Sequence, residues 1–251
     1  GIQLTGERFT TTSAMMGDAV ATMTDFPAEI RAPAGSPGGV SGFQLTFSSG
    51  EVYSSTDRVD ALVVMNPAAM KMNISYLRPD GMLIVNRDAF TEENFAKAGY
   101  SANPLETEAY SSYNVVDLPI SALTAKALDG MGFTSAEVER CKNFFALGLM
   151  FWLYQREIDS TRLWINKKFK KNPKLAEANC RALDAGWDVG ETTELFATRF
   201  DLERTNSVKT PGTYRHITGN KAAALGLVVA AQKSGLKLYL ASYPITPATE
   251  I

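Results

Sequence analysis

Two short, almost wholly apolar runs constrain the fold of this chain more than any other feature of its sequence. Residues 60–65 read Asp-Ala-Leu-Val-Val-Met, and residues 82–85 read Met-Leu-Ile-Val. Runs of this length without polar alternation are typical of strands that are covered on both faces, as in a parallel sheet. Asn66-Pro67 suits a helix start, with the helix running to about Leu77, and Pro79-Asp80-Gly81 is predicted to be a turn. The spacing therefore predicts a βαβ unit with a right-handed crossover.

An asparagine follows each of these two strands, at positions 66 and 86. In open α/β sheets ligands bind beyond the carboxyl ends of the strands, so Asn66 is a candidate ligand contact. An asparagine directly before a proline is also a good N-cap, and for Asn66 capping is the stronger interpretation.

Further helices and strands are predicted on both sides of this unit. Residues 26–42, rich in Pro, Gly and Ala, are predicted to be an exposed loop that carries Glu29 and Arg31. Gly186 is expected to stop a helix, and residues 190–194 are expected to start a helix or to form a ligand loop. The other predicted helices span 1–23, 91–98, 121–130, 135–154, 160–169 and 174–185, and strands span 42–47 and 115–119.

The helix after Thr134 is the most apolar of the chain. Thr134-Ser135-Ala136-Glu137 is a capping box, and apolar residues then occur on nearly all sides of the helix as far as Tyr154. Such a helix is expected to be buried inside the domain or against a partner subunit. Cys141 is accordingly interpreted as a small packed hydrophobe and not as a nucleophile. The two amphipathic helices that follow are expected to form a helical appendage to the sheet.

The C-terminal stretch predicts a helix at Asn220–Ser234 with Gly235 as its cap, then a strand at Leu236–Leu240. Tyr-Pro-Ile-Thr-Pro follows at 243–247. Pro247 suits the first position of a helix, with Thr246 at the N-cap, so a hydroxyl and a helix N-terminus meet at one spot. That spot suits an anion, although an ordinary capped strand-to-helix turn explains the same residues.

Composition restricts the classes of partner. The 251 residues carry a net charge of -2, and Lys167-Lys168-Phe169-Lys170-Lys171 is the only basic run, which indicates a solvated helix end and not a nucleic-acid patch. Two distant cysteines favour a reducing compartment and cannot by themselves ligate an iron–sulfur cluster. We expect a cytoplasmic protein without a signal peptide or a membrane span, and a fragment of a longer polypeptide.

Several motifs together resemble one enzyme family. Ile217-Thr218-Gly219-Asn220-Lys221 to Gly226, followed by Ser242-Tyr243-Pro244-Ile245-Thr246-Pro247, is similar to the opening of the pyrimidine-binding domain of 2-oxoacid:ferredoxin oxidoreductases. The closest similarity is to 2-oxoglutarate enzymes (2-oxoglutarate synthases) in which a gamma domain is fused ahead of the alpha domain. The same form is resembled by residues 25–35, 140–148 and 190–194, so the resemblance covers essentially the whole chain.

The resemblance implies a fold and a domain layout. Residues 1–203 are expected to be the gamma domain, an α/β unit with three α/β/α layers, a mostly parallel sheet and a helical appendage. Residues 204–215, polar and containing Pro211-Gly212, are expected to be a linker. Residues 216–251 are expected to begin the pyrimidine-binding α/β domain. In the family a glycine-rich turn precedes the first helix, and only Gly1 of it would be present here.

The resemblance also implies a reaction. The family converts a 2-oxo acid and coenzyme A to acyl-CoA and carbon dioxide, with electrons passing to ferredoxin, or runs in reverse. Thiamine diphosphate, Mg²⁺ and a [4Fe-4S] cluster would lie mainly on a beta subunit, in an (alpha-beta)2 heterotetramer. No nucleic acid and no membrane are expected as partners.

Site residues follow by the same resemblance. Thr246 would contact the substrate carboxylate, and Tyr243 and Ile245 would shape the pocket beside it. Glu29 and Arg31 would lie on a loop near coenzyme A and the neighbouring thiamine domain, although a surface ion pair or solvated charges explain the same two residues. No catalytic or metal-binding residue is expected within the chain, which alone should be inactive.

Two alternatives of other classes stay open. Residues 1–205 could be a structural module for assembly that touches neither substrate nor cofactor. The chain could also contain a nucleotide-binding α/β domain of unrelated function. The direction of the reaction and the choice of 2-oxo acid rest on the resemblance alone.

Overall fold

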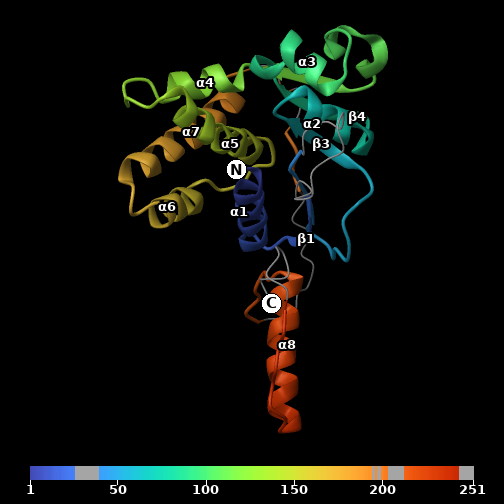
Figure 1. Cartoon of the computed structure of the whole chain (residues 1–251), viewed down its shortest axis with the longest axis vertical. Coiled ribbons are helices and arrows are strands. Elements are labelled where there is room, and N and C mark those ends of the chain that lie inside the picture. The colour runs from blue at the N-terminus through green and yellow to red at the C-terminus, as the bar shows by residue number, and fades with distance from the viewer. Residues whose placement is uncertain (26–39, 194–195, 197–198, 203–211, 243–251) are drawn as a thin grey trace. The chain divides into compact units, whose positions relative to one another are not determined.

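The computed structural model describes residues 1–25, 40–193, 196, 199–202 and 212–242 (Figure 1). The chain divides into two units, Gly1–Ser207 and Val208–Ile251, here called unit 1 and unit 2. Unit 1 holds all the strands of the described residues, with most of the helices. Its helices and strands are α1 (Ile2–Met15), β1 (Ala19–Asp25), β2 (Gly42–Ser48), β3 (Val59–Val64), α2 (Pro67–Asn73), β4 (Leu77–Asn86), α3 (Glu92–Ala98), β5 (Asn114–Leu118), α4 (Ile120–Ala127), α5 (Ser135–Leu153), α6 (Asp159–Lys168) and α7 (Pro173–Thr192), with short 3-10 turns at Ile74–Tyr76, Arg87–Ala89, Pro104–Glu106 and Glu108–Tyr110.

The centre of unit 1 is a parallel three-stranded sheet in the order β3-β4-β5. The predicted βαβ unit is confirmed, since α2 connects β3 to the parallel β4. The predicted turn at 79–81 is wrong, because these residues lie within β4. They form an irregularity where the register with β3 shifts, and Asp80 has a positive φ of 57° while its N–H donates to the Ser112 carbonyl. The turn residues therefore mark a bulge inside one long strand.

Helices cover both faces of this sheet, as the α/β/α expectation requires. Along β4, Met82 and Ile84 belong to one buried cluster, together with side chains of α4, α5 and α7. Leu83 and Val85 belong to the other cluster, which includes Met70 of α2. Side chains of a strand alternate between its faces, so β4 contributes to two cores at once. This explains why the run 82–85 contains no polar residue.

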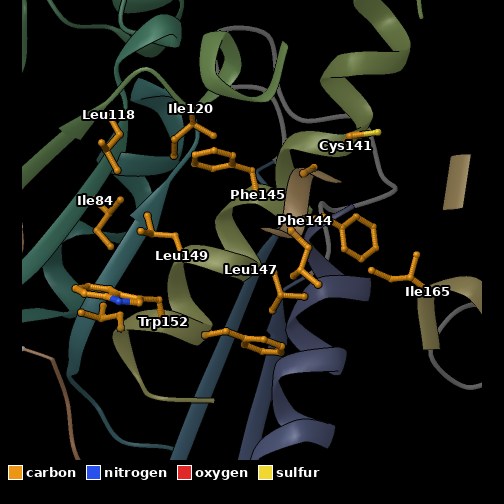
Figure 2. Close-up of a cluster of buried hydrophobic side chains, with 14 of the residues drawn as sticks. Ile84, Leu118, Ile120, Cys141, Phe144, Phe145, Leu147, Leu149, Trp152 and Ile165 are labelled. Carbon is orange, nitrogen blue, oxygen red and sulfur yellow. The ribbon is translucent and has the colours of Figure 1, made fainter. Parts of the chain in front are cut away.

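The larger core is built around α5, whose side chains fill the space between the sheet and α7 (Figure 2). Ile84 and Leu118 of the sheet lie on one side of it, and Ile165 of α6 lies on the other. Phe145 and Leu149 of α5 are fully buried. The expectation that this helix is buried inside the domain is confirmed, and so is its capping box at Thr134 and Glu137.

α5 and α7 cross at very short range through glycines. A Cβ at Gly186 would lie 1.9 Å from the carbonyl oxygen of Phe145, and one at Gly148 would lie 1.9 Å from that of Leu183. The prediction that Gly186 ends a helix is therefore wrong: α7 runs on to Thr192, and the glycine serves the crossing. The segment 190–194, expected to start a helix or to form a ligand loop, instead begins as the last turn of α7.

The N-terminal segment differs from its prediction. A helix was expected over residues 1–23, but α1 ends at Met15 and β1 begins at Ala19. Gly17 between them has φ +96°, which few residues other than glycine adopt. β1 then pairs antiparallel with β2 in a separate two-stranded sheet, so strand pairing overrides the helical spacing.

In unit 2 the described residues 212–242 contain one helix, α8 (Gly219–Ser234). Gly235 ends it with φ +67°, as predicted, and Thr218 caps its start. The strand expected at Leu236–Leu240 is absent from these described residues, since a strand needs a partner to satisfy its backbone. Leu225, Val229 and Leu240 are exposed in this unit. None of the helices of the described chain is both long enough and apolar enough to cross a membrane.

Candidate functional site

A cleft of about 740 Å³ opens at the carboxyl ends of β3 and β4. This is the edge of a parallel sheet where ligands of α/β proteins bind, and its volume suits a ligand of cofactor size. Its apolar walls come from Ile2, Val40, Val63, Met65, Pro67, Ala68, Ala69 and Ala89, and its polar lining from Ser41, Asn66, Asp88, Asn94, Lys97, Ser121, Glu139, Lys142 and Asn143.

Asn66 sits where β3 passes into α2. Its Oδ1 accepts a hydrogen bond of 2.8 Å from the Ala69 N–H, and its backbone is extended. The capping interpretation of Asn66 is thus confirmed. Asn66 is also exposed and lines the cleft, so the same residue can cap α2 and contact a ligand.

The next strand end is tied to the start of α4. Asn86 is fully buried; its Oδ1 accepts from the Ser121 N–H at 3.2 Å and its Nδ2 donates to Ser121 Oγ at 3.1 Å. Asp88 Oδ2 accepts from the Ala122 N–H at 2.8 Å. An acidic group at a helix N-terminus is favoured by the dipole. These bonds satisfy the first amides of α4, which fixes the loop after β4 as one wall of the cleft.

α5 contributes an ion pair to the polar lining of the cleft. Lys142 Nζ contacts Glu139 Oε2, and the Lys142 side chain is only 21% exposed. Burial alone would raise the pKa of Glu139, but hydrogen bonds from Lys142 and Ser121 and the charge of Lys142 bring that pKa below its ordinary value. Glu139 is therefore a carboxylate at neutral pH, and Lys142 offers its remaining N–H donors to the cleft.

The other polar groups of the cleft include a second cation and two amides. Lys97 bonds Glu93 at 2.6 Å on α3 and is well exposed. Asn94 Nδ2 donates to the Ala89 carbonyl at 2.8 Å, and Asn143 follows Lys142 on α5. An apolar floor with two lysines at its rim can hold an elongated ligand that carries an anionic group at one end.

Cys141, next to Lys142 in sequence, is not among the residues that line the cleft. It is buried in the core, and burial with the nearby Glu137 raises the pKa of its thiol. A neutral buried thiol is a poor nucleophile, so the packing interpretation is confirmed. Both cysteines are free thiols.

Apart from Asn66, the residues that the sequence singled out for binding are not among those described. Glu29 and Arg31 lie in the segment 26–39, and Tyr243, Ile245 and Thr246 lie in 243–251; both segments fall outside the described residues. His216 is described and is exposed in unit 2. Within the described ranges, no group of three or more His, Cys, Asp or Glu side chains could hold a metal ion.

Lys142, Glu139, Asn143 and Ser121 were not predicted as site residues. The sequence signal available for the first two was the i, i+3 spacing of opposite charges on a helix that is otherwise apolar. A charged pair on such a helix marks the one side that is not packed. The spacing of residues in the sequence does not show that this charged pair lies close to the carboxyl ends of the strands.

Comparisons with known proteins identify similar sequences over the whole length of the chain. Residues 1–189 match the family described as pyruvate ferredoxin/flavodoxin oxidoreductase. The 2-oxoglutarate oxidoreductase subunit KorA of Mycobacterium tuberculosis is 48% identical over 251 residues, which are 100% of this chain and 38% of that protein.

Two solved structures are similar in fold. The 2-oxoglutarate:ferredoxin oxidoreductase from Magnetococcus marinus, solved with 2-oxoglutarate, coenzyme A and succinyl-CoA bound, matches with a TM-score of 0.70 and 25% identity, over 100% of this chain and 38% of that one. The gamma subunit of a keto/oxoacid ferredoxin oxidoreductase from Geobacter sulfurreducens matches with a TM-score of 0.50 and 18% identity, over 76% of this chain and 91% of that one.

Proposed function

Because the chain belongs to the pyruvate ferredoxin/flavodoxin oxidoreductase family, we propose that it forms part of the alpha subunit of a 2-oxoglutarate:ferredoxin oxidoreductase. The reaction takes 2-oxoglutarate and coenzyme A to succinyl-CoA and carbon dioxide, and passes two electrons to ferredoxin. The observation that carries this proposal is the similarity of all 251 residues to a 2-oxoglutarate oxidoreductase subunit. The chain spans 38% of that relative's length, so the activity belongs to the longer protein and its partners.

For unit 1 we propose that the cleft receives coenzyme A. The ligand is elongated, with an uncharged pantetheine arm and a phosphorylated nucleotide end. The apolar floor from Val63, Met65 and Pro67 suits the arm, and Lys142 at the rim suits a phosphate. In support, the Magnetococcus enzyme, similar over the whole chain, binds coenzyme A.

Two segments outside the described residues carry further proposed contacts. Glu29 and Arg31 are proposed to lie near coenzyme A; the described chain resumes at Val40, and Val40 and Ser41 line the cleft. Thr246 is proposed to bind the carboxylate of the 2-oxo acid through its hydroxyl and the start of the helix after it. Tyr243 and Ile245 are proposed to shape the pocket beside it.

The remaining groups are proposed on a beta subunit, within an (alpha-beta)2 assembly in the cytoplasm. Thiamine diphosphate with Mg²⁺ supplies the electron sink that decarboxylation needs, and a [4Fe-4S] cluster takes up the electrons. The free thiols Cys141 and Cys180 support a reducing compartment. We also propose the domain layout: a gamma domain at 1–203, a linker at 204–215 and the start of the pyrimidine-binding domain at 216–251.

The test uses the full-length alpha chain co-expressed with its beta partner. Reduction of a viologen dye is followed with 2-oxoglutarate and coenzyme A, and then repeated with Thr246→Val, which keeps the shape and removes the hydroxyl. We expect activity in the parent and a loss of at least tenfold in kcat/KM for 2-oxoglutarate in the variant. Absence of 2-oxo acid activity in the parent would overturn the function, whereas full activity of the variant would overturn only the role of Thr246.

A further inference from the structure

A concentrated positive surface lies at the turn between α6 and α7, far along the sequence from the cleft residues of the sheet. It comprises Lys167, Lys168, Lys170, Lys171 and Lys174, here called the basic turn, and all five lysines are exposed. In Figure 1 the α6–α7 turn lies on the side of unit 1 away from β3 and β4. The basic turn is therefore separate from the proposed coenzyme A cleft.

The backbone of the basic turn is held in place from inside. The Phe169 N–H donates to the Ile165 carbonyl at 2.9 Å, and the Asn172 N–H donates to the Phe169 carbonyl at 2.8 Å. Asn172 Oδ1 caps α7 through the Leu175 N–H at 3.1 Å. The Phe169 ring packs edge-on against Phe144 of the core, with ring centroids 6.3 Å apart. The backbone of the turn is thus fixed by hydrogen bonds and packing, and it carries five exposed lysines.

The positive charge of this surface is only partly compensated by neighbouring acids: Lys174 acts on the carboxylate of Glu137. Asp159 and Asp184 pair with Arg162, and Glu177 pairs with Arg181, so these three acids of α6 and α7 are paired with arginines. Within the described part of the chain, none of the five lysines takes part in an ion pair. Since the whole chain carries a net charge of -2, the excess of positive charge is local to this turn.

This composition favours one type of partner. Lysines are depleted in the cores of stable interfaces, and the only large exposed apolar side chain on α6 is Leu163. A charged, almost purely polar surface suits a brief, electrostatically steered encounter, as between redox proteins. A basic surface confined to one turn lacks the extended positive potential that a nucleic acid or an anionic membrane requires.

We propose that the basic turn docks the small acidic protein that carries electrons away from the enzyme, a ferredoxin or flavodoxin with an acidic face. This rests on the proposed function, which requires such a carrier. The lysines raise the rate of encounter by attracting the acidic face, and salt weakens the attraction. From the sequence alone, these lysines are interpreted as a solvated helix end. The proposal adds a binding partner to that exposed surface.

The test compares two acceptors in the assembled full-length enzyme. The variant Lys168→Gln, Lys170→Gln, Lys171→Gln is assayed with an acidic ferredoxin and with a viologen dye. We expect kcat/KM for ferredoxin to fall at least tenfold at low ionic strength, the difference to shrink as salt is added, and the viologen rate to stay within twofold of the parent. A matched variant with three other exposed lysines, Lys126→Gln, Lys233→Gln, Lys237→Gln, should keep the parent's rate with ferredoxin.

Two outcomes would overturn the docking proposal. One is an unchanged ferredoxin rate; the other is an equal loss with both acceptors, which indicates a structural defect. Binding of oxidised ferredoxin to the parent and the variant, measured without turnover by biolayer interferometry, tests the docking even if the enzyme oxidises no 2-oxo acid. Binding to anionic vesicles or RNA, without binding to ferredoxin, would also contradict it.

Discussion

The residue that decides most about the proposed site is Lys142. It lies at the rim of the cleft, is largely screened from solvent, and is held by Glu139, which the hydrogen bond from Ser121 fixes in turn. The lysine is thus positioned before a ligand arrives, so little side-chain entropy is lost on binding. A pre-positioned cation beside an apolar floor is the feature that distinguishes this cleft from an ordinary surface hollow.

Replacing Lys142 by Gln removes this charge and leaves an uncharged polar side chain. A hydrogen bond to a charged group contributes about 1.5–3 kcal/mol, so KM for coenzyme A should rise about tenfold or more. KM for 2-oxoglutarate should stay within twofold, since that substrate is proposed to bind through Thr246. The control is Lys126→Gln, an exposed lysine outside the cleft. An equal rise in both KM values, or none for coenzyme A, would contradict the proposed role of the cleft.

At the scale of elements, the contact between α5 and α7 holds unit 1 together. Gly186→Ala would place a methyl group 1.9 Å from the Phe145 carbonyl oxygen, where backbone and not a flexible side chain must move. We expect the free energy of unfolding to fall by about 3 kcal/mol. Urea denaturation followed by tryptophan fluorescence measures it, because Trp152, Trp164 and Trp187 lie on α5, α6 and α7.

The control for this variant is Gly50→Ala, where the nearest atom to the added Cβ would be 3.7 Å away. Its free energy of unfolding should change by no more than about 0.5 kcal/mol. A Gly186→Ala variant as stable as the parent would show that the helices can separate at no cost.

The capping box of α5 makes a prediction about pH. Hydrogen bonds from the Thr134 backbone N–H and hydroxyl lower the pKa of Glu137 below its ordinary 4.5. A lowered pKa means that the folded state favours the carboxylate, so the stabilisation is present above 4.5 and is lost as the pH falls through the lowered value. Glu137→Gln keeps the shape but not the charge, and should be less stable than the parent at neutral pH.

The difference between the parent and Glu137→Gln should shrink in acid, when the parent carboxylate is protonated as well. Urea titrations at neutral and at acidic pH measure it. A stability difference that is independent of pH would show that the charge of Glu137 does not contribute to the cap.

Most elements of unit 1 could be predicted because their signals are local. The strands at 60–65 and 82–85 are apolar runs, and the caps at Asn66 and Thr134 depend on residues three positions apart. The failures share one cause, which is packing between distant residues. Gly186 has the composition of a helix end, but its role is set by Phe145.

At the scale of the whole molecule, the edge of the sheet at which the cleft opens followed from the sequence, but its charged wall did not. Parallel strands place their carboxyl ends together, which made Asn66 a candidate. Glu139 and Lys142 reach the same place from α5, which is far along the chain and depends on how that helix packs. The charge pattern of α6 and α7 could be seen in the sequence. Which acids pair with the arginines could be known only from the fold.

The measurement that tests the account most directly is the product balance of the full-length alpha chain assembled with its beta partner. The enzyme is incubated with 2-oxoglutarate, coenzyme A and oxidised viologen, and succinyl-CoA, carbon dioxide and reduced dye are counted by mass spectrometry, gas analysis and absorbance. Because decarboxylation releases two electrons and the dye takes one, we predict one succinyl-CoA and one carbon dioxide for every two reduced viologens. Dye reduction that needs no coenzyme A, or that yields no acyl-CoA, would contradict the assignment of this chain to a coenzyme A-acylating oxidoreductase.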